Sequence, residues 1–277
     1  LSHIREVDAI ILVLRAFSDP NVINTQNNIN PARDAKIIDL ELMLADLETL
    51  TKRQESMAKE VKAHSTSSGQ ARDKETTILS ATIDKAIRAL EQEKTLRLLD
   101  WTDGELAALM SLSLLTLKSL LVVLNVDETD LSGSPIKLGI TVKDDMTIPV
   151  SAKIESEIAQ LDPEEAKEFM VSLGMEESGL DKVARAAYSL LGLQSYYTAG
   201  EKEARAWTIK QGSTATQAAG VIHTDFQKGF IAAEIISYND FLKFGGWNGG
   251  RVAGKVRTEG KTYIMQPNDV VEFRFNV

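Results

Sequence analysis

The chain has 277 residues, of which 43% are hydrophobic and 26% charged, so its length predicts about two domains and its composition excludes wholesale disorder. There are 31 Lys and Arg and 40 Asp and Glu residues, and the net charge of −9 excludes a uniformly basic nucleic-acid coat protein. The absence of cysteine excludes disulfides and fits a reducing compartment, and three histidines argue against a histidine-rich metal site.

The first half of the chain predicts a strand followed by two long helices. Residues 9–14 are an unbroken apolar run rich in Ile and Val, as in a strand buried on both faces of a parallel sheet. From about residue 32 the period becomes helical, and a small polar stretch at 65–70 separates two helices that should form a hairpin. Each helix has an apolar face, formed by Ile37, Leu40, Leu44 and Leu47 and by Leu79, Ile83, Ala86 and Leu90.

The sequence then returns to strands. Thr102 and Glu105 have the spacing of a capping box, which predicts a third helix running to about Leu114. Residues 119–124 and 147–150 predict two more buried strands, and 162–191 is helical with Pro163 at its first position. No apolar run is long enough to span a membrane, and no secretory signal is visible. Strands interleaved with helices predict an α/β sheet that carries a helical excursion.

The last part of the chain differs from the rest in its predicted secondary structure and in its charge. Short strands are predicted at 206–209, 231–237, 263–265 and 270–275, separated by Gly-rich loops. Residues 193–277 hold ten Lys and Arg and eight Asp and Glu residues, a net charge of +2, against −11 for the remainder. This region therefore predicts a separate, small α+β domain.

Two short motifs follow predicted strands. Asn125-Val126-Asp127-Glu128 comes directly after the strand at 119–124, and Ser151-Ala152-Lys153 follows the strand at 147–150. Ligands of open α/β sheets bind outside the carboxyl ends of strands, and an Asn amide both donates to and accepts from a purine edge. By itself Asn-x-x-Glu is more typical of a surface turn. The pair of motifs, however, resembles the two base-recognition loops of Ras-like P-loop nucleotidases.

The whole chain resembles the YchF/Obg-like ATPase family. The blocks that carry the resemblance are 125–128, 169–180 (FMVSLGMEESGL), 197–200, 205–209, 217–220, 223–230 (HTDFQKGF) and 268–277. The resemblance implies an incomplete P-loop nucleotidase sheet with an inserted α-helical hairpin, plus a small β-grasp, TGS-like domain. The implied boundaries are 1–36 and 113–192 for the nucleotide-binding domain, 37–112 for the hairpin and 193–277 for the TGS domain.

The resemblance also implies which parts of an ATPase this sequence holds. The family's phosphate-binding loop and Mg²⁺ ligand lie upstream of the segment that matches Leu1, so we expect a base-recognition half that is inactive alone, with no catalytic or metal-binding residue. Residues 249–256 have a G-x4-G-K skeleton, but Val256 stands where a P-loop has Ser or Thr, and no buried strand precedes them. We interpret this skeleton as coincidental.

The expected function is that of an ATP-binding, ribosome-associated, cytoplasmic ATPase that uses Mg²⁺ with ATP. Asn125 should read the base, Val126 should pack against its ring, Glu128 should shape the pocket or hold the loop, and backbone groups at Ser151 and Ala152 should close the site. Replacement of the Asn-Lys-x-Asp pattern of GTPases argues against strict guanine specificity. A non-enzymatic docking module or a true GTPase remains an alternative.

Partner contacts are expected from the small domain. The candidates for contact with ribosomal RNA are Lys202, Arg205, Lys228 and Arg257, and neither a membrane nor a specific DNA sequence is an expected partner. We interpret His223 as a residue that arranges a turn, and Trp207 and Phe230 as core residues rather than stacking platforms.

Overall fold

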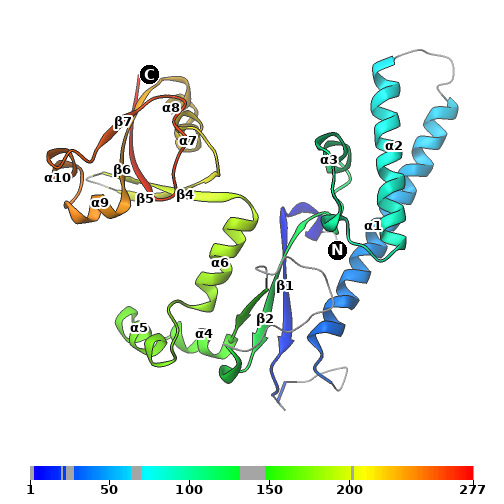
Figure 1. Ribbon diagram of the computed structural model, residues 1–277, viewed down its shortest axis with the longest axis horizontal. Helices are drawn as coiled ribbons and strands as arrows, with labels where there is room; N and C mark the ends of the chain where they lie inside the picture. Colours follow the sequence, from blue (N-terminus) through cyan, green and yellow to red (C-terminus); the bar gives the residue numbers. More distant parts are fainter. Residues whose placement is uncertain are drawn as a thin grey trace. The chain divides into compact units, whose positions relative to one another are not determined.

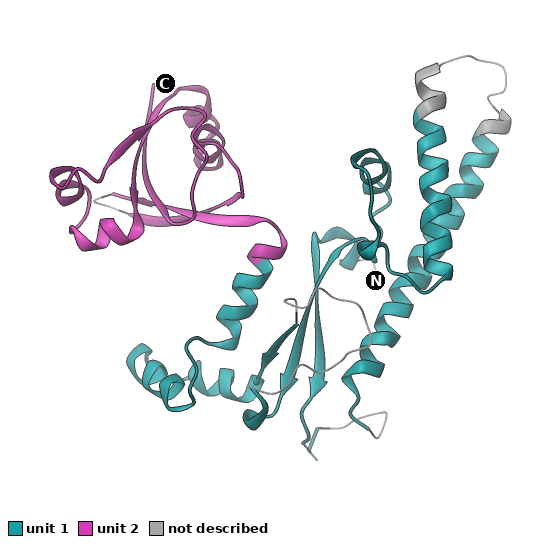
Figure 2. Cartoon of the chain, in the orientation of Figure 1, with its two compact units in different colours: residues 1–187 teal, residues 188–277 magenta. Residues whose placement is uncertain are grey.

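The computed structural model describes residues 3–19, 21–22, 28–63, 70–131, 147–200 and 203–276. The chain divides into two compact units, residues 1–187 and residues 188–277 (Figure 2). Helix α6 (Gly179–Leu190) contains the boundary between them. Among the described residues no helix combines the length and the hydropathy that crossing a membrane requires.

The first unit is built on a parallel sheet of order β1-β2-β3 (Figure 1). Its strands are β1 (Ala9–Ala16), β2 (Ser119–Val126) and β3 (Thr147–Val150), so all three predicted strands are confirmed. In the register, Arg15 lies opposite Asn125, and Asn125 lies opposite Val150. The carboxyl ends of the three strands therefore meet at one edge of the sheet.

The first unit also contains two long helices that pack against each other. The helical elements of the first unit are η1 (His3–Glu6), α1 (Pro31–Ala63), α2 (Gln70–Glu91), η2 (Leu96–Leu98), α3 (Asp103–Met110), η3 (Glu128–Asp130), α4 (Ala152–Ile158), α5 (Pro163–Ser172) and α6. Helices α1 and α2 lie side by side (Figure 1). In the sequence both helices come between β1 and β2. The predicted tip at 65–70 lies outside the described residues except for Gln70.

The buried face of α1 differs from the predicted one. Leu40 and Leu47 pack against the hairpin core, but Ile37 and Leu44 are 45% and 66% exposed, and Met43 and Leu50 are buried instead. The predicted stripe is therefore wrong at two of its four positions. The reason is that α1 serves two cores, since Ala35 packs under the sheet while the later turns pack on α2. The predicted face of α2 is confirmed by buried Ile83, Ala86 and Leu90.

The segment between α3 and β2 is held by a buried carboxylate. The capping box is confirmed, because the Glu105 N–H donates to Thr102 Oγ1 over 3.3 Å and the Thr102 N–H donates to Glu105 Oε2 over 2.8 Å. The helix ends at Met110 rather than Leu114. The Leu115 and Thr116 N–H groups instead donate to Asp46 of α1, over 2.8 and 2.7 Å. These long-range bonds take the backbone out of helical geometry before β2.

The predicted helical region 162–191 is two helices. Asp162 accepts from the Glu164 and Glu165 N–H groups over 3.0 Å and Pro163 begins α5, as the sequence predicts. Residues 173–178 interrupt the helix, with Gly174 at a φ of +69°. Helix α4, which follows β3 directly, was not predicted as a separate element.

The second unit is a five-stranded mixed sheet of order β5-β4-β8-β6-β7. Its elements are β4 (Leu193–Ala199), β5 (Ala204–Lys210), α7 (Ala215–Ile222), α8 (Thr224–Lys228), β6 (Phe230–Ser237), α9 (Tyr238–Lys243), α10 (Trp247–Val252), β7 (Arg257–Glu259) and β8 (Asp269–Phe275). Strands β4 and β8 are parallel, and the other neighbours are antiparallel.

Three of the four strands predicted in this unit are confirmed, as β5, β6 and β8. The predicted strand at 263–265 is wrong, because that segment makes only an isolated bridge between Ile264 and Thr214. Strands β4 and β7 were not predicted. The polar residues of β4 hid it from the sequence, and buried Gln194 is satisfied by donating from Nε2 to the Met265 carbonyl over 2.8 Å.

The core of the second unit confirms the interpretation of its aromatic residues. Phe230 is buried, and Trp207 packs against the same cluster. Tyr196 is fully buried and its hydroxyl donates to the Ala218 carbonyl over 2.9 Å, and this burial raises the pKa of Tyr196. His223 accepts the Asp225 N–H at Nδ1 over 3.1 Å and begins α8. Its predicted role in a turn is therefore confirmed.

Candidate functional site

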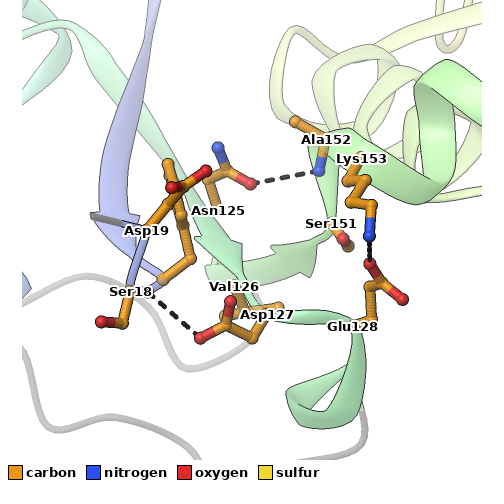
Figure 3. A pocket seen from close by; sticks show the side chains of 10 residues that line it. Ser18, Asp19, Asn125, Val126, Asp127, Glu128, Ser151, Ala152 and Lys153 are labelled. Atoms are coloured by element: carbon orange, nitrogen blue, oxygen red, sulfur yellow. Dashed lines mark hydrogen bonds and ion pairs between the residues drawn. The ribbon is translucent and has the colours of Figure 1, made fainter. Parts of the chain in front are cut away.

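The exits of the three parallel strands enclose a cavity of about 470 Å³ (Figure 3). A cavity of this size at the carboxyl ends of strands suits a small organic ligand. The residues that line it are Phe17, Ser18 and Asp19 after β1, Asn125, Val126, Asp127 and Glu128 at the end of β2, and Ser151, Ala152 and Lys153 after β3. All five residues predicted to contact a base therefore line one cavity.

Asn125 joins two of these strand exits. Its side-chain Oδ1 accepts the Ala152 N–H over 3.1 Å, which ties the end of β2 to the first residue of α4. The amide nitrogen lies on the other side of the side chain from this bond (Figure 3). Within the described part of the chain this nitrogen donates to no other group, so Asn125 presents a hydrogen-bond donor to the cavity.

The β1 exit was missed by the sequence reasoning. The Ser18 N–H donates to Asp127 Oδ2 over 3.1 Å, so Asp127 ties the β1 exit to the β2 exit (Figure 3). Arg15 holds the same loop, because Nε donates to the Phe17 carbonyl and Nη2 to the Asp19 carbonyl, each over 3.2 Å. The signal that could have found this loop is its position after a predicted parallel strand.

Glu128 and Lys153 form an ion pair between the β2 and β3 exits (Figure 3). The hydrogen bond from Lys153 and the negative charge of Glu128 raise the pKa of Lys153. Both side chains remain accessible, with 47% of Glu128 and 70% of Lys153 exposed. Such an exposed pair adds little to folding stability. Because both residues line the cavity, the positive charge of Lys153 balances the negative charge of Glu128 there.

Val126 and Ser151 shape the cavity wall. Val126 is 5% exposed and packs with Leu14 and Leu124 in the core below the sheet, so only a small part of its side chain is available to a ring. Ser151 is 2% exposed and precedes α4. Packing in the protein interior therefore fixes the positions of these two side chains.

A buried carboxylate connects α4, the helix that follows β3, to α6. Glu155 of α4 is 8% exposed and accepts the Gly179 N–H over 2.7 Å at the start of α6. A Cβ at Gly179 would lie 2.9 Å from the Glu155 carboxylate and 3.0 Å from Val150, so a larger residue here would displace these side chains. Helix α4, whose first N–H meets Asn125, is thus fixed at a second point.

Comparison with known proteins places the chain in a family. It is 45% identical to the Ribosome-binding ATPase YchF of Bacillus subtilis (strain 168), over 100% of this chain and 75% of that protein. It is 44% identical to the protein of the same name from Escherichia coli O157:H7, with the same coverage. The chain belongs to the YchF family.

Two further comparisons agree with this membership. The family YchF-GTPase_C, described as "Protein of unknown function (DUF933)", matches residues 193–276. The solved structure of the Schizosaccharomyces pombe YchF GTPase superposes with a TM-score of 0.82 at 36% identity, covering 99% of this chain and 74% of that one. The observed α/β architecture is therefore that of a YchF protein.

Carboxylates are the side chains that a divalent cation would use in this YchF chain. No group of three or more potential His, Asp or Glu ligands occurs in the described ranges. The carboxylates at the cavity already have partners, since Asp127 accepts from Ser18 and Glu128 pairs with Lys153. These two carboxylates therefore join one strand exit to another.

The described cationic residues that are expected to contact a partner lie on different elements of the second unit. Arg205 lies on β5 and Arg257 on β7, which are opposite edges of the five-stranded sheet, and Lys228 ends α8. Arg205 stacks over Trp207 with 4.2 Å to the ring centroid, and Arg257 donates to the Tyr263 hydroxyl over 3.3 Å. Lys202 lies outside the described residues.

The G-x4-G-K skeleton at 249–256 is explained by packing. Its first glycine, Gly249, and the neighbouring Gly250 belong to the short helix α10, which follows α9 rather than a strand. Its second glycine, Gly254, lies beyond the end of this helix at a φ of +65°. A Cβ at Gly249 would lie 1.8 Å from the Phe244 carbonyl oxygen, and one at Gly250 would lie 2.5 Å from Ile236. These glycines allow α10 to pack closely against its own unit, as expected for a coincidental match.

Proposed function

We propose that this YchF-family chain binds the base of an adenine nucleotide and belongs to an ATP-binding, ribosome-associated ATPase. The observation that supports this most directly is the Asn125–Ala152 hydrogen bond, which joins the two predicted base loops at one cavity. The bacterial relatives are named as ribosome-binding ATPases, in agreement with the proposal. No step of ATP hydrolysis is assigned to the described residues.

The choice of adenine rests on the residues that depart from the GTPase pattern. In Asn-Lys-x-Asp loops the carboxylate accepts hydrogen bonds from the ring N–H and the 2-amino group of guanine. Here Val126 replaces the Lys, and Glu128 replaces the Asp and is paired with Lys153. The S. pombe relative is titled a GTPase, whereas the bacterial relatives are named ATPases, so the nucleotide is the point to test.

Each unit has a proposed role. Residues 1–36 and 113–192 supply the nucleotide-binding domain, 37–112 the inserted helical hairpin and 193–277 a TGS-like domain of β-grasp type. The mixed sheet in which β4 runs parallel to β8 and β6 antiparallel to it supports the β-grasp assignment. The buried core shared by α1, α2 and α3 supports the hairpin as a separate element.

Replacement of Asn125 by Ala should weaken base binding. The substitution removes both the bond to Ala152 and the amide donor in the cavity, so the loss combines two hydrogen bonds. Each such bond contributes about 1 kcal/mol, and we expect ADP and GDP affinity to fall by roughly tenfold or more. Titration of the 277-residue chain with ADP and GDP by two-dimensional NMR measures the two dissociation constants.

Ser156→Ala is the matched control, since Ser156 is an exposed residue of α4 that does not line the cavity. This variant should bind both nucleotides as the unchanged chain does. Equal affinities for the Asn125→Ala variant and the unchanged chain would contradict the assignment of the site. Nucleotide binding to neither protein would favour the alternative of a docking module without nucleotide.

Ribosome association should depend on the second unit. Reversing the charge of Lys202, Arg205, Lys228 and Arg257 removes contacts that would release counterions from RNA phosphates. We expect about a tenfold loss of co-sedimentation with ribosomes and a shallower dependence on salt. Reversal of Arg205 and of Arg257 alone distinguishes the two sheet edges, because only one of them should carry most of the loss.

Lys52→Glu on α1 is the control, as Lys52 is an exposed residue of the helical hairpin. If this variant loses ribosome association and the second-unit variants do not, docking belongs to the hairpin. If all variants associate with ribosomes as the unchanged chain does, the proposed electrostatic contact with ribosomal RNA would be wrong.

A further inference from the structure

The pair formed by Lys153 and Glu128 lines the cavity and joins the β2 and β3 exits (Figure 3). We propose that Lys153 is a specificity-determining residue, which favours adenine over guanine by occupying the carboxylate of Glu128. This inference rests on the proposed binding of a purine base in the cavity. It assigns the choice between the two bases to a residue outside the Asn125–Glu128 motif.

Asn125 by itself does not distinguish the two bases. Its Oδ1 is engaged by the Ala152 N–H, and the group that remains directed away from this bond is the amide nitrogen, a donor (Figure 3). Adenine and guanine both carry an acceptor at N7, so a single donor serves them equally. The discrimination must therefore come from another group at the cavity.

Glu128 has the chemistry that discriminates. A carboxylate accepts two hydrogen bonds side by side, which matches the ring N–H and 2-amino group of guanine. Adenine has an unprotonated ring nitrogen at the corresponding place, which an unpaired carboxylate repels. An unpaired Glu128 would thus favour guanine, although it is one methylene longer than the Asp of GTPase loops.

Lys153 reverses this preference. Its ammonium group, which is protonated at neutral pH, donates to the Glu128 carboxylate and balances its charge, and this contact raises the pKa of Lys153 further. Guanine would have to displace Lys153 from Glu128, whereas adenine meets a neutral pair with ammonium donors to spare. Glu157 and Asp19 also contribute negative charge that favours the protonated lysine.

The test compares nucleotide preference, expressed as the Kd for GDP divided by the Kd for ADP, in the 277-residue chain. In Lys153→Met the stem is kept and the charge is removed, so this ratio should fall about two- to fivefold, as expected for an exposed ion pair. Lys153→Arg keeps the pair and should retain the ratio. In a Glu128→Gln background, Lys153→Met should leave the ratio unchanged, because the carboxylate is already absent.

The outcomes separate this inference from the proposed function. If the unchanged chain binds both nucleotides and the Lys153→Met ratio equals its own, the specificity role is overturned while the base site stands. An equal loss of affinity for both nucleotides in Lys153→Met also overturns it, because the lysine would then contact a group that ADP and GDP share. Binding of neither nucleotide to the unchanged chain overturns the proposed function itself.

Discussion

Asp46→Ala should destabilise the first unit by about 3 kcal/mol or more. Asp46 is fully buried and accepts from the Leu115 N–H, the Thr116 N–H and the Thr116 hydroxyl, over 2.8, 2.7 and 2.7 Å. Removing the carboxylate leaves these three buried donors without an acceptor, and each costs about 1–3 kcal/mol. Urea unfolding followed through amide resonances of the first unit gives the free-energy change.

A local measurement makes the Asp46 prediction specific. The amides of Leu115 and Thr116 should lose hydrogen-exchange protection in Asp46→Ala more than amides in the middle of β2, because they lose their direct partner. Glu41→Ala on the same helix is the control, since Glu41 is exposed and its loss should change stability by less than about 0.5 kcal/mol. A loss below about 1 kcal/mol for Asp46→Ala would contradict the prediction.

The same contact connects the hairpin to the candidate site. Asp46 lies on α1, and the segment it holds leads directly into β2, which carries Asn125 near its end. Arg5 reinforces the junction, because its guanidinium donates to the Ser113 carbonyl and to Thr49 Oγ1, over 3.2 and 3.1 Å. Weakened nucleotide affinity in Asp46→Ala at temperatures where the unit stays folded would show that the junction also positions the strand.

Gly249→Ala should destabilise the second unit by about 3 kcal/mol or more. The new Cβ would lie 1.8 Å from the carbonyl oxygen of Phe244, which belongs to the backbone and cannot rotate away. Relief requires α10 to move, and this would disturb Trp247, whose Nε1 donates to the Ala199 carbonyl over 2.7 Å. Overpacking of this kind lies at the upper end of the usual range of destabilisation.

Gly260→Ala is the matched control in the same unit. No atom lies within 4 Å of a Cβ at Gly260, and its backbone is not in the left-handed region, so the change should be below about 0.5 kcal/mol. Urea titration followed through resonances of residues 203–276 compares the two variants. Similar stability of both would mean that α10 adjusts freely, and the packing explanation of the G-x4-G-K skeleton would then fail.

Much of the fold could be predicted because its signals are local. The three parallel strands are short runs of branched apolar residues, and the ends of α3 and α5 carry capping residues within a few positions. These patterns act through backbone preference and burial, which neighbouring residues determine. The strands without such patterns were missed, as with β4, where Gln194 is buried only because Met265 supplies its acceptor.

The candidate site was predicted in its residues but not in its contacts. The motif Asn125–Glu128 and residues 151–153 were found because each follows a strand, and a parallel sheet brings such ends together. The third lining loop at residues 17–19 and the role of Lys153 depend on how side chains meet across loops. The spacing of residues within one segment does not predict contacts between side chains of different loops.

The sequence by itself determined the α/β class, the order of most of the elements and the resemblance to the family, since these follow from local periodicity and from motifs in fixed order. Only the tertiary structure decided that Asn125 gives its oxygen to Ala152, that Asp46 caps a segment far along the chain, and that Arg205 and Arg257 lie on opposite sheet edges. The physical reason is that hydrogen bonds and ion pairs act over a few ångströms in space, whatever the separation of their residues along the chain.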